Sequence, residues 1–319
     1  MSKKYAYVTF MMRNDSYLPG ALVLAYSLKN NQTPHDIICL VTEEVSENAK
    51  SCLSIVFDYV IEINEFKLKS QIKGQRADRD SLLTRFQVLR LGIDSDLSTG
   101  YERIIVLDAD VLPIKKYDNL FEIDAPAGII MEKKNLWTSY DEKGSLIRKA
   151  DENGEWCWHS HYNTICPHGS HIPKTITDRV VYDPANMGVN AALWRIDPSM
   201  NEYKYFIHYL EQKNISELVT RKFPWPEMQL ATMMWSGEWK SIDIRYCSIG
   251  GYPDLNVLYG IHFAGLKPWQ INSRSICHYA KYPDFQLWYS NFAALYYSNK
   301  QLHKIPILKR ISKFIQYYV

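Results

Sequence analysis

The order of strand-like and helix-like segments in the first hundred residues is the feature that most restricts the fold. Three apolar, β-rich runs at residues 5–12, 36–42 and 59–63 alternate with helical segments at 21–28 and 46–57. This β-α-β-α-β order is typical of a parallel sheet that is covered by helices. We therefore predict an α/β fold.

The composition is that of a folded protein. Of the 319 residues, 46% are hydrophobic and 23% are charged, which is ordinary for a globular chain. Length alone does not decide between one large domain and two smaller ones. The net charge is +2 and the basic residues are dispersed, so we expect no nucleic-acid-binding surface.

The N-terminal segment, the length of the apolar stretches and the cysteines bear on the cellular compartment of the protein. Arg13 interrupts the N-terminal apolar run and no small-residue cleavage site follows, so we interpret the run as a strand rather than a signal peptide. No uncharged apolar stretch reaches the roughly 18 to 20 residues that span a bilayer. There is no C-x-x-C, and Cys39 and Cys52 lie in apolar segments. We expect reduced thiols in a soluble, cytoplasmic protein.

The most informative motif is Asp108-Ala109-Asp110, which follows a predicted buried strand at residues 103–107. Open α/β sheets bind ligands outside the carboxyl ends of their strands. Two carboxylates at such an end can converge on one hard cation and leave positions open for diphosphate oxygens. A second Asp-x-Asp at residues 94–96 follows a helix and is interpreted as a solvated turn. Context therefore favours Asp108 and Asp110.

The helix before residues 94–96 is predicted for 81–93. Its apolar residues recur at the spacing of one helical face. They are Leu82, Phe86, Leu89 and Ile93.

The rest of the chain contains an irregular part and a second regular part. Residues 133–183 lack hydrophobic periodicity and are interpreted as an insertion in the same domain. A strand at 189–196 and helices at 198–213 and 227–239 follow. The last forty residues are expected to form helices packed on the outside. We thus predict one domain at residues 1–275 and a C-terminal helical extension at 276–319.

A second motif runs from His262 to Trp269. A neutral imidazole can complete a mixed oxygen and nitrogen coordination shell. Gly265 allows a close backbone approach, and Lys267 can neutralise a diphosphate leaving group. Pro268 and Trp269 can stiffen and bury the loop. Taken alone, however, His262 is explained more readily as a core histidine and Lys267 as a surface cation.

In their order and spacing, these motifs resemble glycosyltransferase family 8, the glycogenin-like enzymes with the GT-A fold, from Tyr5 to Trp269. The resemblance implies a single GT-A domain with a Rossmann-like mixed sheet, helices on both faces and C-terminal helices. It also implies a retaining, metal-dependent transferase that moves a hexose, with glucose favoured, from a UDP-sugar to a hydroxyl of a glycan or protein. The similar segments are Tyr7–Phe10, Asn14–Tyr17, Gly20–Leu24, Leu83–Arg85, Asp108–Asp110 and His262–Trp269.

The resemblance further implies roles for single residues. Asp108, Asp110 and His262 would bind manganese, with magnesium as the alternative ion. Lys267, Glu227 and Asp110 would act in catalysis, with Glu227 near the sugar. In the donor site, Phe10, Met12, Asn14 and Tyr17 would hold uracil and ribose, Arg76 and Arg85 the phosphates, Asn186 and the Gly188 turn the sugar, and Asp108, Ala109, Gly265 and Lys267 would complete the set.

The chain departs from the family pattern near the donor sugar. Glu227-Met228-Gln229 stands where the family usually has Asp-Gln-Gly, and Asn186-Met187-Gly188 replaces Asn-Ser-Gly or Asn-Ala-Gly. The identity of the sugar and of the acceptor is therefore left open. A nucleotide-sugar hydrolase and a non-catalytic UDP-sugar-binding scaffold are the alternatives, and a homodimer is compatible with each. The segment at 246–259 is shorter than the acceptor-tyrosine segment of glycogenin, which disfavours self-glucosylation.

The insertion is rich in cysteine and histidine, which allows two interpretations. One is a zinc site, and the other is an acceptor-binding loop with incidental histidines. The spacing matches no standard zinc finger, and Trp156 and Trp158 lie alongside, so the acceptor-binding loop is favoured. The potential zinc ligands are Cys157, His159, His161, Cys166, His168 and His171.

Overall fold

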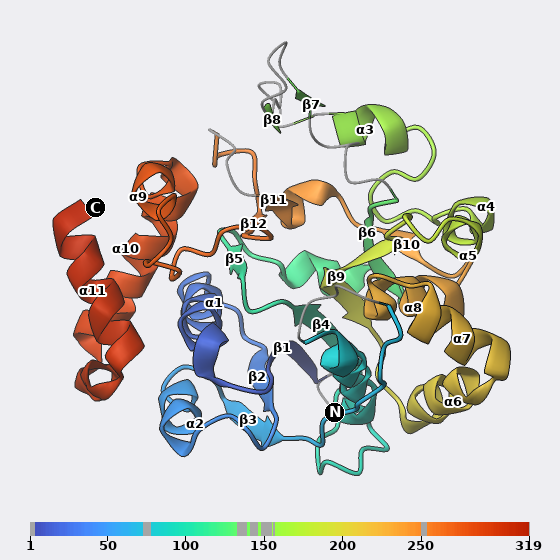
Figure 1. Cartoon of the computed structure of the whole chain (residues 1–319), viewed down its shortest axis with the longest axis horizontal. Helices are drawn as coiled ribbons and strands as arrows, with labels where there is room; N and C mark the ends of the chain where they lie inside the picture. The colour runs from blue at the N-terminus through green and yellow to red at the C-terminus, as the bar shows by residue number, and fades with distance from the viewer. Residues whose placement is uncertain are drawn as a thin grey trace.

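A mixed seven-stranded sheet with strand order β10-β6-β9-β4-β1-β2-β3 forms the centre of the molecule (Figure 1). The computed structural model describes residues 4–72, 78–132, 139–140, 146–147, 155, 157–249 and 254–318. The strands of the large sheet are β1 (Tyr5–Met11), β2 (Asp36–Val41), β3 (Tyr59–Glu62), β4 (Arg103–Leu107), β6 (Ala127–Ile130), β9 (Val189–Ile196) and β10 (Lys240–Ser241).

The predicted β-α-β-α-β segment forms the parallel part of this sheet. Strand β1 pairs in parallel with β2 and β4, and β2 pairs in parallel with β3. Strands β1, β2 and β4 are buried along almost their whole length, which explains their continuous apolar sequences. Strand β9 is antiparallel to both β4 and β6, so the sheet is mixed.

Two smaller sheets accompany the large one. One contains β11 (Ser248–Ile249), β12 (Gly260–His262) and β5 (Val111–Pro113), and the other pairs β7 (Ser139–Tyr140) with β8 (Leu146–Ile147). The first of these matters for the site because β5 follows the Asp-x-Asp motif directly, while β12 ends in His262.

Helices cover both faces of the large sheet (Figure 1). Helices α1 and α2 lie on one side, whereas η2, α6, α7 and α8 lie on the other, and α10 packs on α1. The α-helices are α1 (Leu18–Asn30), α2 (Glu47–Leu53), α3 (Cys157–Tyr162), α4 (Lys174–Thr177), α5 (Arg179–Tyr182), α6 (Met200–Glu211), α7 (Lys213–Arg221), α8 (Pro226–Met234), α9 (Ile276–Tyr279), α10 (Pro283–Ser298) and α11 (Pro306–Tyr318). The 3-10 helices are η1 (Asp15–Tyr17), η2 (Arg79–Leu91), η3 (Asp118–Glu122), η5 (Ile244–Tyr246) and η6 (Lys300–Lys304).

Helix starts follow local capping chemistry. The Ser46 hydroxyl accepts a hydrogen bond from the Ala49 amide at 3.2 Å, as expected for the predicted N-cap of α2. Ser199 caps α6 in the same way through the amide of Glu202. Helix α2 ends at Leu53, four residues before the predicted boundary, because the chain then turns into β3.

The predicted amphipathic helix at 81–93 is partly wrong. The segment is a 3-10 helix from Arg79 to Leu91, it is buried on nearly all sides, and Ile93 is 74% exposed. Gly92 stops the helix by adopting an extended conformation against the carbonyl group of Pro198, where a Cβ would lie 2.2 Å from the oxygen. Ile93 has the spacing of the predicted apolar face, but the helix ends at Leu91, before this residue.

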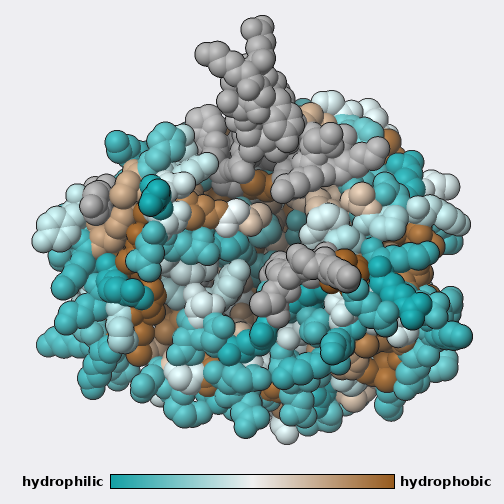
Figure 2. All heavy atoms as spheres, viewed as in Figure 1, coloured by the Kyte–Doolittle hydropathy of each residue, from teal (hydrophilic) through white to brown (hydrophobic). Residues whose placement is uncertain are grey.

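The surface seen in Figure 2 is mainly hydrophilic, and its described hydrophobic residues form separate small patches. No helix in the described parts of the chain is both long and apolar enough to cross a bilayer. All six cysteines are free thiols.

Candidate active site

The Asp-x-Asp motif occupies the turn between β4 and β5. The Asp108 amide donates to the carbonyl oxygen of Ala192 at 3.1 Å, and its carbonyl accepts from the amide of Val111 at 2.9 Å. The chain then runs antiparallel to β12, where His262 pairs with Val111. The Asp110 carbonyl accepts from the amide of Phe263 at 2.9 Å. Backbone pairing thus brings the two motifs of the sequence together.

The side chains of Asp108, Asp110 and His262 converge. One ligand atom from each lies within 4.8 Å of the others, and His262 Nε2 is 3.4 Å from Asp110 Oδ1. Asp110 and His262 are buried, and within the described part of the chain neither Asp110 Oδ1 nor His262 Nδ1 has a hydrogen-bond partner. Two carboxylates and one imidazole suit a divalent ion of the manganese or magnesium type. The residues present therefore fit the metal that the sequence predicts.

Two buried cations neutralise these carboxylates. Arg85 from η2 pairs with Asp108, while Lys267 pairs with Asp110 and donates to the carbonyl oxygen of Phe263 at 2.6 Å. Burial opposes ionisation of Asp110, but His262 and Lys267 hold its pKa well below the usual range. Burial likewise opposes the charged imidazole, yet Asp110 raises the pKa of His262 to about 10. The carboxylate of Asp110 is therefore ionised throughout the neutral range.

A cavity of about 310 Å³ opens beside this cluster. Its size is that of a small-molecule site. The Arg85 guanidinium lies 5.3 Å from the ring centroid of Phe10 and 5.4 Å from that of Trp194, which fixes its position in the wall. Ten residues proposed from the sequence line the cavity: Phe10, Met12, Tyr17, Arg85, Asp108, Ala109, Asp110, Glu227, His262 and Lys267.

Four other described residues of the proposed donor site do not line this cavity: Asn14, Asn186, Gly188 and Gly265. Asn14 is exposed, and its side chain accepts from the amide of Ser16 at the start of η1. Gly265 is also exposed, and a Cβ there would meet no protein atom within 4 Å. Gly188 has φ +70°, and a Cβ would lie 2.2 Å from the hydroxyl oxygen of Thr232. Only glycine fits at position 188, for reasons internal to the fold.

Asn186 stabilises the turn at Gly188 by hydrogen bonds. Its amide nitrogen donates to Glu132 at 3.1 Å, and its side-chain oxygen accepts from the amide of Gly188 at 2.9 Å. The structure thus places Asn186 beside the cavity wall rather than in it. Arg76 lies outside the described residues.

Several cavity residues were not identified from the sequence. Asn190 is half-buried near the start of β9, and its polarity within an apolar strand was an available signal. The others are set by tertiary packing, although several adjoin proposed residues. The set comprises Arg13, Asp78, Ser81, Leu82, Met187, Asn190, Ala191, Trp225, Met228 and Ala264.

Gly20 controls the distance between α1 and the site. A Cβ at this position would lie 2.3 Å from the carbonyl oxygen of Ala109 and 2.4 Å from the ring of Trp269. The start of α1 can therefore press against both sequence motifs only because residue 20 lacks a side chain.

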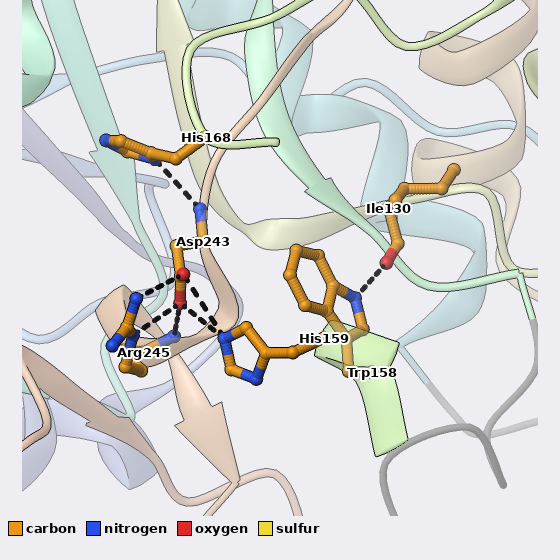
Figure 3. Close-up of polar contacts among 6 residues, drawn as sticks. All are labelled: Ile130, Trp158, His159, His168, Asp243 and Arg245. Carbon is orange, nitrogen blue, oxygen red and sulfur yellow. Dashed lines mark hydrogen bonds and ion pairs between the residues drawn. The ribbon is translucent and has the colours of Figure 1, made fainter. Parts of the chain in front are cut away.

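The histidines of the insertion do not form a metal cluster with its cysteines in the described structure. His159 instead contacts both carboxylate oxygens of Asp243, at 3.1 and 3.2 Å (Figure 3). Arg245 holds the same carboxylate, and His168 Nδ1 accepts from the Asp243 amide (Figure 3). Among the described residues, the group with metal-binding geometry is that of Asp108, Asp110 and His262.

Trp158 is not available to stack on a glycan. It is 1% exposed, and its indole nitrogen donates to the carbonyl oxygen of Ile130 at 2.8 Å (Figure 3). Trp158 and His159 thus fasten α3 to the sheet. Trp156 lies outside the described residues, so the acceptor-binding loop stays a prediction.

The mixed sheet, with an acidic turn and a cavity at the carboxyl end of its central strand, defines the class of GT-A glycosyltransferases. The sequence model described as Glycosyl transferase family 8 matches residues 8–273. The chain belongs to this family, and the resemblance found in the sequence is confirmed.

Relatives of known sequence span the chain to different extents. Protein R707 of Acanthamoeba polyphaga mimivirus, which is uncharacterized, is 28% identical over 280 residues, or 84% of each chain. Glycogenin-1 of Oryctolagus cuniculus is 34% identical over 37% of this chain and 34% of its own length. UDP-glucuronate:xylan alpha-glucuronosyltransferase 2 of Arabidopsis thaliana is 23% identical over 92% of this chain and 40% of its own length. The last two alignments therefore cover less than half of each named enzyme.

Solved structures support the same fold. The galactosyltransferase LgtC in complex with donor and acceptor sugar analogs superposes with a TM-score of 0.55 at 12% identity, covering 91% of this chain and 96% of LgtC. At this level of identity the likeness concerns the fold alone. The predicted α/β fold with a mixed sheet is confirmed.

Proposed function

We propose that this protein is a metal-dependent, retaining glycosyltransferase that moves a hexose, glucose in the first instance, from a UDP-sugar to a hydroxyl of a glycan or protein. The observation that carries the proposal is the convergence of Asp108, Asp110 and His262 beside a cavity that Lys267 also lines. Family membership supports glycosyl transfer as the reaction class. The free thiols agree with the proposed cytoplasmic location.

We assign the residues of the cavity to two tasks: holding the metal ion and stabilising charge on the diphosphate. Asp108, Asp110 and His262 would hold manganese or magnesium, which when bound would stabilise negative charge on the diphosphate as a Lewis acid. Lys267 lies against Asp110 and can donate to a phosphate oxygen as the leaving group gains charge. Arg85 offers a second cation on the opposite side of the acidic turn.

The cavity lining contains residues of two kinds. Phe10, Met12 and Tyr17 are apolar or aromatic and suited to uracil and ribose. Glu227 is a buried carboxylate in the same lining, which also includes Asn190. We propose that the sugar lies beside Glu227 and that Glu227 acts near the anomeric carbon. Retention would follow from same-face attack or from a transient carboxylate adduct, for which Glu227 is the candidate.

The first test is the metal dependence of UDP binding. Both the carboxylates and the diphosphate are anionic, so we expect manganese to tighten UDP binding at least tenfold and to raise the melting temperature in the presence of UDP. Isothermal titration and thermal shift, with and without prior chelation, measure both effects. Equal UDP affinity after rigorous chelation would contradict the metal assignment.

Variants connect this binding to the named residues. Asp110→Asn and His262→Ala should each remove most turnover, because they remove metal ligands whose contribution is commonly several kcal/mol. Asp94→Asn is the matched control. Asp94 accepts from the Met200 amide at the start of α6, so its loss should reduce stability slightly and leave turnover nearly unchanged. An inactive Asp94 variant would show that the wrong acidic pair had been chosen.

An acceptor distinguishes transfer from hydrolysis. UDP release from each UDP-sugar should be slow in buffer and accelerate when the correct glycan or peptide is added. Release that no acceptor accelerates would favour the nucleotide-sugar hydrolase. Donor binding without any UDP release would favour the non-catalytic scaffold.

A further inference from the structure

Helix α10 lies beyond the part of the chain that the family model matches, yet it packs on the active-site loop. The match ends at residue 273, whereas α10 spans Pro283–Ser298. The loop at residues 262–270, here called the Lys267 loop, contains both His262 and Lys267. Three residues of α10 contact this loop, and each of them is at most 3% exposed.

The contacts lie on both sides of Lys267 in the sequence. The ring of Phe285 is 5.2 Å from that of Phe263, in an edge-to-face arrangement. The ring of Trp288 is 5.6 Å from that of Trp269. Aromatic pairs of this kind stabilise packing beyond the area that they bury. The two pairs therefore fix both ends of the segment that carries Lys267.

Tyr289 provides the polar contact. Its hydroxyl donates to the carbonyl oxygen of Pro268 at 2.9 Å, and the residue is 0% exposed. Burial raises the pKa of this phenol well above its ordinary value, so the hydroxyl stays a donor at every working pH. Leaving a buried carbonyl without its donor is costly, so this bond fixes the Pro268–Trp269 peptide, one residue after Lys267.

The Lys267 loop also closes on itself. The Lys267 amide donates to the side-chain oxygen of Gln270 at 3.1 Å, and the ammonium donates to the carbonyl oxygen of Phe263 at 2.6 Å. Trp269 also packs closely against Gly20 of α1. Its ring centroid lies 5.7 Å from that of Tyr17. The ammonium position therefore depends on a loop that is held between α1 and α10.

We infer that α10 positions Lys267 for catalysis and that Tyr289 is the positioning residue through which it acts. The inference rests on the proposed function for the role of the lysine itself. Tyr289 touches no cavity atom; it acts by holding the Pro268 carbonyl group. Small displacements of a catalytic group are expensive, since about 1 Å can cost on the order of a hundredfold in rate.

The test is Tyr289→Phe, which removes one hydroxyl and keeps the ring. We expect kcat to fall about tenfold, while the Kd for UDP with manganese changes less than twofold. Tyr101→Phe is the matched control, because Tyr101 is also buried and also donates one hydroxyl bond, to Asp36 at 2.7 Å. Tyr101 precedes β4 and Asp108 follows it, so the two residues lie at opposite ends of this strand. We expect the two variants to lose similar stability but only Tyr289→Phe to lose kcat.

A double-mutant cycle separates positioning from general loosening. In a Lys267→Ala background, Tyr289→Phe should lower kcat by less than twofold, since there is no ammonium left to position. A full tenfold loss in that background, or an equal loss of kcat in Tyr101→Phe, would overturn the inference. Should Tyr289→Phe fail to fold, Phe285→Leu provides the same comparison through the contact with Phe263.

Hydrogen exchange tests the inference without any turnover. Amides of residues 263–270 should exchange faster in Tyr289→Phe than in the wild type or in Tyr101→Phe. A wild-type protein that releases UDP from no donor would overturn the proposed function while leaving this measurement intact. Unchanged exchange in an active Tyr289→Phe variant with normal kcat would overturn the inference and leave the proposed function standing.

Discussion

Lys267 lies where the cavity, the acidic turn and the C-terminal helices meet. It is buried, it pairs with Asp110, and its ammonium lies 6.0 Å from the ring centroid of Tyr17. Burying an ammonium is costly unless it is paired, and the pair with Asp110 leaves Lys267 beside the proposed metal site. Two roles are open for it: uniform anchoring of phosphate, or stabilisation of the departing diphosphate.

We predict that Lys267→Ala lowers the turnover number more than it weakens donor binding. Negative charge grows on the diphosphate as the sugar departs, so a fixed ammonium matters most at that point. We expect a loss in kcat on the order of a hundredfold, and Lys267→Arg should recover only part of it. Steady-state kinetics at saturating acceptor measures both constants. A change confined to the Michaelis constant would make Lys267 a phosphate anchor and Arg85 the better leaving-group residue.

At the residue scale, the sequence predicted best what short motifs carry. Asp108, Asp110 and His262 lie in short segments whose neighbouring residues already indicate metal or phosphate chemistry. The structure brings the three side chains together. Asn14 and Asn186 were assigned from the family resemblance, and their side chains accept hydrogen bonds from nearby backbone amides, so their donor-site roles stay predictions. Trp225 entered the cavity unpredicted, because its position depends on how the segment before α8 packs across η2.

Among the elements, the start of α1 is tightly constrained at Gly20. Alanine is normally better than glycine within a helix by about 1 kcal/mol. At position 20 we expect the reverse, with Gly20→Ala costing about 1–3 kcal/mol, because its Cβ would overlap the Ala109 carbonyl oxygen and Trp269. Urea denaturation gives the free energy of unfolding, and UDP titration gives the accompanying loss of affinity.

Gly100→Ala is the control for this prediction. A Cβ at Gly100 would meet no atom within 4 Å, so stability and UDP binding should stay near wild-type values. Equal behaviour of the two variants would show that α1 can shift without disturbing the acidic turn.

Helix α3 is attached to the sheet by an ionised carboxylate. Burial opposes the charge on Asp243, but hydrogen bonds from His159 and Arg245 hold its pKa well below the usual range. A depressed folded-state pKa contributes stability that is present above the unfolded pKa of about 4 and is lost as pH falls through the folded value. The contribution of Asp243 should therefore be complete at neutral pH and disappear only in strong acid.

We predict that Asp243→Asn costs about 3 kcal/mol of unfolding free energy at pH 7, as expected for breaking a buried ion pair. The difference from wild type should shrink as pH falls from about 4 towards 2. Asp96→Asn breaks an exposed pair with Arg90 and should cost less than about 1 kcal/mol. Urea titrations at several pH values measure all three proteins. A cost for Asp243→Asn that is independent of pH would argue against an ionised pair.

Element boundaries were predictable where the chain gives a local signal. Strands 103–107 and 189–196 match the predicted ranges because each is a mainly apolar, buried segment. The extent of η2 was not predictable from periodicity, since a helix buried on all sides has no distinct apolar face. The short helices α3 to α5 in the insertion depend on contacts with the sheet and with α8, which no local pattern reveals.

At the scale of the whole molecule, the C-terminal helices share the core of the sheet domain. Phe285, Trp288, Tyr289 and Phe292 are almost fully buried, and α10 packs on α1. The division into a domain at 1–275 and an extension at 276–319 stays a prediction, and it makes a claim about folding that can be measured.

We predict that a chain ending after residue 275 does not fold stably. Loss of one buried aromatic side chain costs about 3–5 kcal/mol, against a total stability of about 5–15 kcal/mol. A chain ending after residue 304 keeps α10 and should retain UDP binding at reduced stability. Circular dichroism melts and UDP titration compare the two. A stable, UDP-binding chain of 275 residues would show that α10 is dispensable for both.

The overall topology followed from the sequence only in part. The parallel half was predictable from the β-α-β-α-β order, whereas the reversal at β9 entered only through the family resemblance. The direction of a strand leaves no mark on a short apolar run, because burial on both faces selects the same residues either way.

That reversal shapes how the chain could diversify. Because β9 is antiparallel to β6, the segment between them leaves and re-enters the sheet at one edge, beside the cavity. The two points are stitched by bonds from the Met131 amide to the Gly188 carbonyl and from the Met187 amide to the Glu132 carbonyl. Lengthening such a closed loop costs little, since each doubling adds about 0.6 kcal/mol. Insertions between β6 and β9 could therefore vary in length in the course of evolution while the scaffold that holds the acidic turn stays the same.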